Sequence, residues 1–370
     1  MKDVGQIRSS FPALKRKAQN GKPAIYFDGP GASQMPKQVH RAYTDHVLNN
    51  KANAGGYFET SVNTNEAVEC ARASLALFMN CDDNEIVMGA NATTSIFQFS
   101  RALSRNWTSE DEIIVTKLDH FANVSPWLEV AKDKNCKTTS IGFDADTGEY
   151  NLADFEKAIT NKTKLVAVNY ACNAIGTINP IKEITKIAHA KGAMVFVDAV
   201  HYAPHGLIDV QNLDCDFLVT SVYKYFGPHI SAVFAKKKHL QNFSPYKVEP
   251  AIDKIPNCWE TGTPDFSAIS AIPSTIKYII SLSGNSSPTR KNLELAYQNI
   301  VEYENELSRY FLQKVSALTH VKLYGLSDVN DVAKRTPTFG LTVNGKTSHQ
   351  VAEYLAKHGI FSWSGHFYAL

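Results

Sequence analysis

Two short apolar runs near the middle of the chain constrain its fold more than any other feature. Residues 194–197 read Met-Val-Phe-Val, and residues 217–220 read Phe-Leu-Val-Thr. Runs this short and apolar on both faces are typical of buried parallel strands. Asp198 follows the first run directly, and Lys224 follows the second after three residues. Because ligands bind beyond the carboxyl ends of parallel strands, we expect both side chains at one site.

Strands and helices alternate on both sides of these runs, which predicts an α/β fold with a doubly wound, mainly parallel sheet covered by helices on both faces. A short strand at 24–27 and helices at 36–50 and 66–79 precede the alternation. Further strands are expected at residues 85–88, 112–116, 138–143, 163–169, 194–197, 217–220 and 230–235, with helices at 96–103, 126–132, 151–159 and 181–191.

The pattern changes after Phe266, where a smaller C-terminal α+β domain is expected. Its main feature is a long amphipathic helix at 290–315 with apolar residues at helical spacing. The domains are predicted at residues 1–22, an N-terminal segment that packs with the small domain, 23–284, a large cofactor-binding domain, and 285–370. Within the last part, strands are expected at 321–324, 338–343 and 360–363 and a helix at 348–358.

Composition excludes several classes of function. The net charge is only +2, and no basic run indicates a nucleic-acid surface. No apolar segment approaches the ~20 residues needed to span a bilayer, and the first thirty residues have no signal-peptide apolar region. The six cysteines are scattered without metal-ligand spacing, which predicts reduced thiols, no metal site and a cytoplasmic location.

Pyridoxal 5'-phosphate is the cofactor that an aspartate and a lysine at two strand ends suit best. It needs a lysine to form a Schiff base and a carboxylate to keep its ring nitrogen protonated. For an isolated pair, the more ordinary explanation is that Asp198 and Lys224 merely end two strands at the surface. The residues after the neighbouring strands therefore decide the interpretation.

Polar groups follow the other strands as well. The turn at 89–95 is rich in small and hydroxyl residues, and its free N–H groups suit a phosphate, although an ordinary N-cap has the same composition. His120 could stack on a ring or serve as a structural hydrogen bonder. Asn173 and His201 could reach a ring hydroxyl, while Ser221 and Tyr223 offer hydroxyls to a phosphate. Such convergence in one crevice is expected of a binding site.

Seven motifs, taken in order, resemble those of fold-type I pyridoxal-phosphate enzymes of the class V aminotransferase group, close to the cysteine desulfurases and selenocysteine lyases. The resemblance covers nearly the whole chain and is strongest to a desulfurase-like subgroup without a firmly assigned reaction. It lies in residues 26–31 (YFDGPG), 119–127 (DHFANVSPW), 173–180 (NAIGTINP), 197–201 (VDAVH), 221–228 (SVYKYFGP), 259–264 (WETGTP) and 363–369 (WSGHFYA).

The resemblance implies a role for each site residue. Lys224 would form the Schiff base and shuttle a proton at the substrate α-carbon, Asp198 would pair with the ring nitrogen, and His120 would stack on the ring. His201 stands where the desulfurases place a glutamine against the phenolic oxygen, and Asn173 would face the substrate carboxylate. The phosphate would be held by Thr93, Thr94, Ser221 and Tyr223, and by Thr263 from the other subunit of a homodimer.

The chain departs from the desulfurase pattern near its C-terminus. Trp363 and Tyr368 stand where desulfurases carry an arginine and the sulfur-accepting cysteine, and the last cysteine of the chain is Cys258. A persulfide route needs a thiolate at that position. Family members also continue for some tens of residues through a strand with a carboxylate-binding arginine, so the small domain is expected to be incomplete at Leu370.

Three hypotheses follow. The first is an enzyme that labilises a bond of a small amino acid through a Schiff base with pyridoxal phosphate, as a desulfurase-like lyase, an epimerase or an aminotransferase. The second is a catalytically impaired relative that keeps the cofactor and the dimer for a binding or scaffold role. The third is an α/β protein without the cofactor, which the ordered motifs disfavour.

Overall fold

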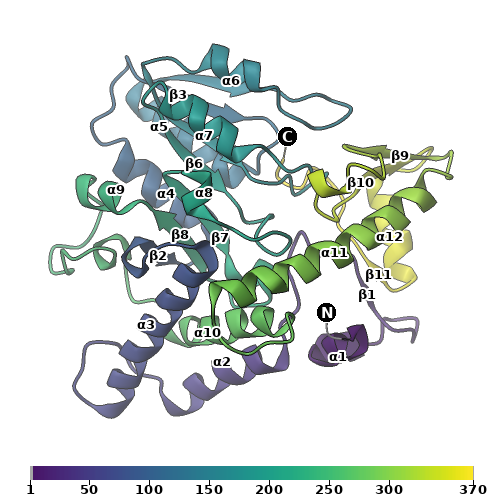
Figure 1. Ribbon diagram of the computed structural model, residues 1–370, viewed down its shortest axis with the longest axis horizontal. Coiled ribbons are helices and arrows are strands. Elements are labelled where there is room, and N and C mark those ends of the chain that lie inside the picture. Colours follow the sequence, from purple (N-terminus) through teal and green to yellow (C-terminus); the bar gives the residue numbers. More distant parts are fainter. Residues whose placement is uncertain (1–2, 370) are drawn as a thin grey trace.

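The computed structural model describes residues 3–369, and a seven-stranded sheet lies at its centre (Figure 1). The strand order is β2-β8-β7-β6-β5-β3-β4, and within this sheet only β8 runs against the others. The predicted mainly parallel sheet is therefore confirmed. The strands are β2 (Ile86–Gly89), β3 (Glu112–Thr116), β4 (Lys137–Ile141), β5 (Thr163–Asn169), β6 (Met194–Asp198), β7 (Phe217–Ser221) and β8 (Ser231–Ala235).

The central strands are buried on both faces, which explains why their sequences are apolar throughout. In β6, Val195 and Val197 face one core while Phe196 faces the other. The Phe196 ring stacks on that of Phe217 at a centroid distance of 5.7 Å. Side chains of successive residues therefore stabilise two separate helical layers.

Helices cover both faces of the sheet. One face packs against α4 (Ala92–Leu103) and α5 (Ser125–Lys134). The other core contains residues of α3, α6, α7, α8, α10 and α11. These and the remaining helices of the region are α2 (Lys37–Asn49), α3 (Glu59–Met79), α6 (Leu152–Ala158), α7 (Ile181–His189), α8 (Val210–Leu213), α9 (Lys237–Asn242) and α10 (Phe266–Ser281).

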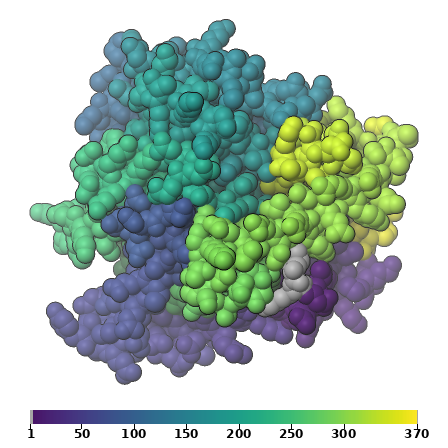
Figure 2. Space-filling view, in the orientation of Figure 1, coloured from purple at the N-terminus to yellow at the C-terminus, as the bar shows by residue number. Residues whose placement is uncertain are grey.

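The C-terminal elements form a smaller unit beside the sheet. The strands β9 (Val321–Tyr324) and β10 (Gly340–Val343) pair antiparallel, and β11 (Ile360–Phe361) pairs in parallel with β1 (Ile25–Tyr26). Asn20 donates a hydrogen bond to the Lys357 carbonyl (3.1 Å), so the N-terminal chain lies against this unit. Figure 2 shows the yellow C-terminal residues packed against the teal sheet region. The helices here are α11 (Arg290–Val315) and α12 (Ser348–Lys357), with α1 (Val4–Ser9) near the N-terminus.

Short 3-10 helices connect several of these elements. They are η1 (Pro12–Lys15), η2 (Asp83–Glu85), η3 (Phe121–Asn123), η4 (Val222–Tyr225), η5 (Asn257–Trp259) and η6 (Val332–Lys334). Between residues 3 and 369, no helix combines the length and the apolar character that crossing a bilayer requires.

Three helices differ from the sequence prediction. Helix α3 begins at Glu59, seven residues before the predicted start at Glu66. The added turns are polar, and they are held by Ser61, whose hydroxyl donates to the Asn53 carbonyl (2.6 Å), and by Thr64. An apolar pattern cannot reveal turns held by hydroxyl groups. The short helices α8 and α9 were not predicted either.

Asp216 directly precedes β7, at the end of the sheet opposite Asp198 and Lys224, and it connects α7, α9 and β6. Its carboxylate accepts hydrogen bonds from His189 Nε2 (2.8 Å), His239 Nε2 (2.7 Å) and the Val195 N–H (2.9 Å). Burial alone would raise the pKa of Asp216, but the bonds from the two histidines outweigh it and hold that pKa below its usual value.

We expect Asp216→Asn to lower the free energy of unfolding by about 3 kcal/mol, because one amide oxygen cannot serve three buried donors. A carboxyl with a depressed pKa stabilises the fold above the unfolded pKa of about 3.9, and this stabilisation is lost as the pH falls. Urea unfolding at pH 7 and below pH 4 measures both effects. Asp214→Asn is the control: that side chain is 66% exposed, so its change should stay below about 1 kcal/mol. Equal effects of the two substitutions would contradict the prediction.

Candidate active site

One cavity lies beyond the carboxyl ends of the parallel strands. Its volume is about 520 Å³, within the roughly 300–1,000 Å³ of small-molecule sites. All predicted site residues except Thr94 and Thr263 line it, which places groups from five separate loops around one space. The residues concerned are Thr93, His120, Asn173, Asp198, His201, Ser221, Tyr223 and Lys224.

Asp198 and Lys224 lie at the buried end of this cavity. Burial raises the pKa of Asp198 to about 6, against the opposing effects of the Val200 N–H (2.8 Å) and Lys224. Burial lowers the pKa of Lys224 to about 8, and Asp198 counteracts the shift. Near pH 8 about half of the Lys224 amine is therefore neutral, the form that attacks a carbonyl carbon, while Asp198 remains an anion.

The Lys224 ammonium is held by a loop from the N-terminal part of the chain. Its Nζ donates to the carbonyl oxygens of Pro30 and Gly31. A Cβ on Gly31 would lie 2.2 Å from the Trp363 indole nitrogen, so only glycine allows this approach. The loop at 28–31, Lys224 and the C-terminal segment are thus packed as one assembly.

His120 is neutral and has a defined tautomer. The Ala122 N–H donates to its Nδ1 (3.0 Å), so the ring proton is on Nε2. Burial, reinforced by Lys224, lowers the pKa of His120 to about 4. An uncharged flat ring at this position is suited to packing on a second ring.

His201 links the site to the C-terminal unit. Its Nε2 lies 2.9 Å from the Thr338 hydroxyl and 3.2 Å from that of Thr336. Burial, with smaller effects of His205 and Lys224, holds the pKa of His201 well below its usual value, so the ring is neutral. Residues that follow β6 and residues that precede β10 therefore meet at one imidazole.

The start of α4 faces the cavity, but its hydroxyl groups are not equivalent. Asn91 caps the helix by accepting from the Thr94 N–H (2.9 Å). Asn91, Ala92 and Thr93 line the cavity, whereas Thr94 does not. Thr263 is exposed on a turn outside the cavity of its own chain.

Sequence reasoning missed two groups of residues that line the cavity. The first is Asp119, which is 1% exposed. The sequence interpretation assigned a role to the neighbouring His120 and none to this aspartate. The segment 363–368 also lines the cavity. Its position depends on distant hydrogen bonds, from Asn173 Nδ2 to the Phe367 carbonyl (2.8 Å) and from the Phe121 N–H to the Tyr368 carbonyl (2.7 Å). No local pattern encodes such contacts.

The arrangement fits pyridoxal phosphate. It offers a partly neutral lysine, a buried carboxylate, a neutral imidazole and a helix N-terminus around one cavity. A helix N-terminus favours a phosphate through its free N–H groups. The buried Asp119 Oδ1 has no hydrogen-bond partner among residues 3–369, as expected of a polar atom that a ligand completes.

Comparison with known proteins agrees with this geometry. Residues 25–369 match the model of the family "Aminotransferase class-V". The chain belongs to this family. The predicted resemblance to fold-type I pyridoxal-phosphate enzymes of the class V group, and the predicted fold class, are thereby confirmed.

The similar proteins include both cysteine desulfurases and an aminotransferase-like protein. A probable cysteine desulfurase of Halalkalibacterium halodurans is 30% identical, over 98% of this chain and 87% of that protein. The aminotransferase-like protein FGM3 of Gibberella zeae is also 30% identical, over 99% of this chain and 88% of its own. The apo structure of a cysteine desulfurase from Thermococcus onnurineus superposes with a TM-score of 0.87 at 26% identity, covering 100% of this chain and 89% of that one.

Gly176, in the turn at 173–177, packs against Thr336 and Thr338, whose hydroxyls contact His201. Gly176 has a φ of +84°, and an added Cβ would lie 2.7 Å from the Thr338 carbonyl oxygen and 2.8 Å from that of Thr336. We expect Gly176→Ala to lower the free energy of unfolding by about 3 kcal/mol, since backbone strain and overpacking add.

Gly192→Ala is the matched control, because Gly192 also has a positive φ (+78°) but has open space around its would-be Cβ. It should cost only about 1 kcal/mol. Chemical denaturation measures both variants, and a Gly176 variant no less stable than the control would contradict the close packing of Thr336 and Thr338.

Proposed function

We propose that this chain is a pyridoxal 5'-phosphate-dependent enzyme that acts on a small amino acid. The observation that carries the proposal is the meeting of Asp198, Lys224 and His120 in one buried cavity of a class V fold. When bound, the cofactor supplies an electron sink for a carbanion at the substrate α-carbon.

Each site residue then has a role set by its charge and position. Asp198 holds a proton on the ring nitrogen, because a buried carboxylate favours the cation beside it. His120 would cover one face of the ring without adding charge, and neutral His201 would lie near its edge. Lys224 would hold the cofactor covalently and would move a proton at the substrate α-carbon, for which a pKa of about 8 is well matched.

The phosphate is held by the start of α4. Asn91, Ala92 and Thr93 line the cavity there, and Thr93, Ser221 and Tyr223 would add hydroxyls from the cavity wall. Thr94 lies beside this group, and its N–H already bonds to Asn91; we assign it a contact only through its hydroxyl. Asn173, whose amide donates to the Phe367 carbonyl, faces the substrate carboxylate.

The outcome of the reaction depends on the mouth of the cavity. Tyr368 stands there with its ring 5.5 Å from that of His120, and none of the residues that line the described cavity is a cysteine. A phenol cannot accept sulfur as a thiolate does. We therefore propose cleavage of a Cα or Cβ bond without a persulfide on this segment, as in a lyase, an epimerase or an aminotransferase. The alternative is a catalytically impaired protein that retains the cofactor for a binding or scaffold role.

The purified protein should absorb visible light after addition of pyridoxal phosphate, and Lys224→Ala should abolish that band because no other residue there forms the imine. Lys132→Ala is the control, since the Lys132 side chain is 71% exposed on α5. Absence of the band from the wild type would contradict both the enzyme and the scaffold proposals.

A panel of amino acids then separates these two proposals. Spectral changes and product formation support an enzyme, and an unresponsive band supports the scaffold. With cysteine, release of sulfide and alanine would establish desulfuration and overturn the proposed restriction by Tyr368.

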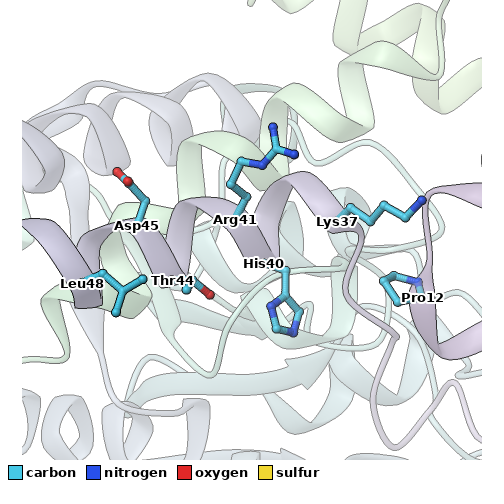
Figure 3. A pocket seen from close by; sticks show the side chains of 7 residues that line it. All are labelled: Pro12, Lys37, His40, Arg41, Thr44, Asp45 and Leu48. Atoms are coloured by element: carbon cyan, nitrogen blue, oxygen red, sulfur yellow. The ribbon is translucent and has the colours of Figure 1, made fainter.

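We also propose a homodimer, formed through α2, the loop at 50–58 and the start of α3. Large apolar side chains are exposed there: Leu48 is 74%, Phe58 61% and Tyr57 fully exposed. Exposed apolar side chains that gather on successive elements in this way are typical of an interface. The adjoining face of α2 is a shallow hollow of about 550 Å³ (Figure 3), lined by Pro12, Lys37, His40, Arg41, Thr44, Asp45 and Leu48.

The turn that carries Thr263 belongs to the same region. Asp265 accepts a hydrogen bond from Tyr43 of α2 (3.5 Å), so Thr263 is near the proposed interface. This position supports a phosphate contact across the dimer. All six cysteines are free thiols, which supports the proposed cytoplasmic location.

We expect Thr263→Ala to weaken cofactor binding about tenfold, the loss of one hydrogen bond to a charged group, without dissociating the dimer. Phe58→Ser should instead shift the protein to monomers and weaken binding indirectly. Equilibrium dialysis and light scattering measure the two quantities. Unchanged cofactor binding by Thr263→Ala would show that Thr263 does not contact the phosphate. A monomeric wild type would contradict the proposed homodimer.

A further inference from the structure

Asp119 is a buried carboxyl of the cavity to which the function proposed above assigns no role. It follows β3 after Lys117 and Leu118, is 1% exposed, and lines the same cavity as Asp198. A carboxyl buried to this degree normally has a cation or several donors around it.

The two oxygens of Asp119 have different surroundings. Oδ2 accepts from Asn123 Nδ2 (2.8 Å) and from the Thr116 hydroxyl (3.3 Å). Asn123 is itself fixed, because its Oδ1 accepts from the buried Trp127 indole (3.4 Å). Oδ1 is fully buried and has no hydrogen-bond partner within the described residues. Asp119 is therefore held rigidly by one oxygen, and the other is left for something the protein does not provide.

The surroundings of Asp119 contain no compensating positive charge. The titratable groups that face it are Asp198 at the end of β6, Tyr150 before α6 and Cys172 after β5. Lys224 acts on Asp198, and no cation among residues 3–369 bonds to Asp119. Burial, reinforced by the negative charge of Asp198, holds the pKa of Asp119 well above its usual value, against the weaker effects of Asn123, Thr116 and the His120 N–H.

We propose that Asp119 carries a proton on Oδ1 and donates it as a hydrogen bond to an acceptor atom of the group that binds in this cavity. A protonated carboxyl has one O–H donor. The two side-chain donors, Asn123 Nδ2 and the Thr116 hydroxyl, both point at Oδ2, so the proton belongs on Oδ1. Asp119 is then a ligand-binding residue of opposite character to Asp198: one carboxyl donates and the other carries the negative charge. The inference rests on the proposed function, with pyridoxal phosphate as the bound group.

Two substitutions separate this role from a structural one. Asn at position 119 reproduces the protonated acid, since its oxygen can accept from Asn123 and Thr116 while its NH₂ donates to the ligand. Leu has a similar shape but neither group. We expect Asp119→Asn to bind pyridoxal phosphate within about threefold of the wild type and Asp119→Leu to bind at least about tenfold more weakly. Circular dichroism establishes that each variant is folded, and Asp133→Asn on the exposed side of α5 is the control.

Two readouts without turnover complete the test. The infrared carbonyl band of a protonated carboxyl should be present in the wild type at pH 7 and absent from Asp119→Asn. A carboxyl whose pKa is raised by folding makes the fold less stable as the pH rises from about 4 towards the raised value, because the unfolded chain releases the proton first. Asp198, whose pKa is also raised by burial, contributes to the same decline, so thermal unfolding of Asp119→Asn should show a smaller decline than the wild type.

The outcomes are distinguishable. If the wild type binds no pyridoxal phosphate, the proposed function fails. If the wild type binds it but Asp119→Asn loses tenfold or more, or if the two proteins have the same infrared bands, then Asp119 is ionised and the inference is overturned while the function stands. Unchanged binding by a folded Asp119→Leu also overturns it.

Discussion

The site depends on the burial of several charged side chains at the carboxyl ends of the parallel strands. Asp198 and Lys224 both lie where water is largely excluded, and each reduces the shift that burial alone would impose on the pKa of the other. The attraction between them keeps an anion and a partly neutral amine in the same cavity near pH 8. No cation among residues 3–369 bonds to Asp119. In our proposal this carboxyl is therefore protonated, whereas Asp198 in the same cavity is ionised.

The sequence predicted those parts of the site that are local to a strand. Asp198 could be assigned because an apolar run ends directly before it, and Lys224 because only three residues separate it from the end of the next run. The mainly parallel sheet followed from the alternation of strands and helices. The reversed direction of β8 did not, because an apolar strand of five residues has the same sequence pattern in either direction.

The parts that the sequence could not predict depend on contacts between distant segments. Asp119 differs from any buried turn aspartate only in that Asn123 and Thr116 share one of its oxygens and leave the other bare. The place of residues 363–368 over the cavity depends on bonds to Asn173 and Phe121. Periodicity reports which face of an element is buried, but not which loop it meets.

The C-terminal unit is part of the site for the same reason. The Arg335 guanidinium is buried and donates to the carbonyls of Leu326, Ile175 and Thr338. It thereby holds the residues before β10 against the turn that carries Asn173, and Thr338 in turn contacts His201. Arg335 makes no ion pair in the described chain, and burial lowers its pKa to about 10. Its charge is balanced by backbone carbonyls and by the face of the Phe339 ring, whose centroid lies 4.3 Å from Cζ. A shift of the small unit would alter the surroundings of His201, and the imidazole is therefore one of the points, together with Asn173 and Asp28, at which the C-terminal residues contact the site.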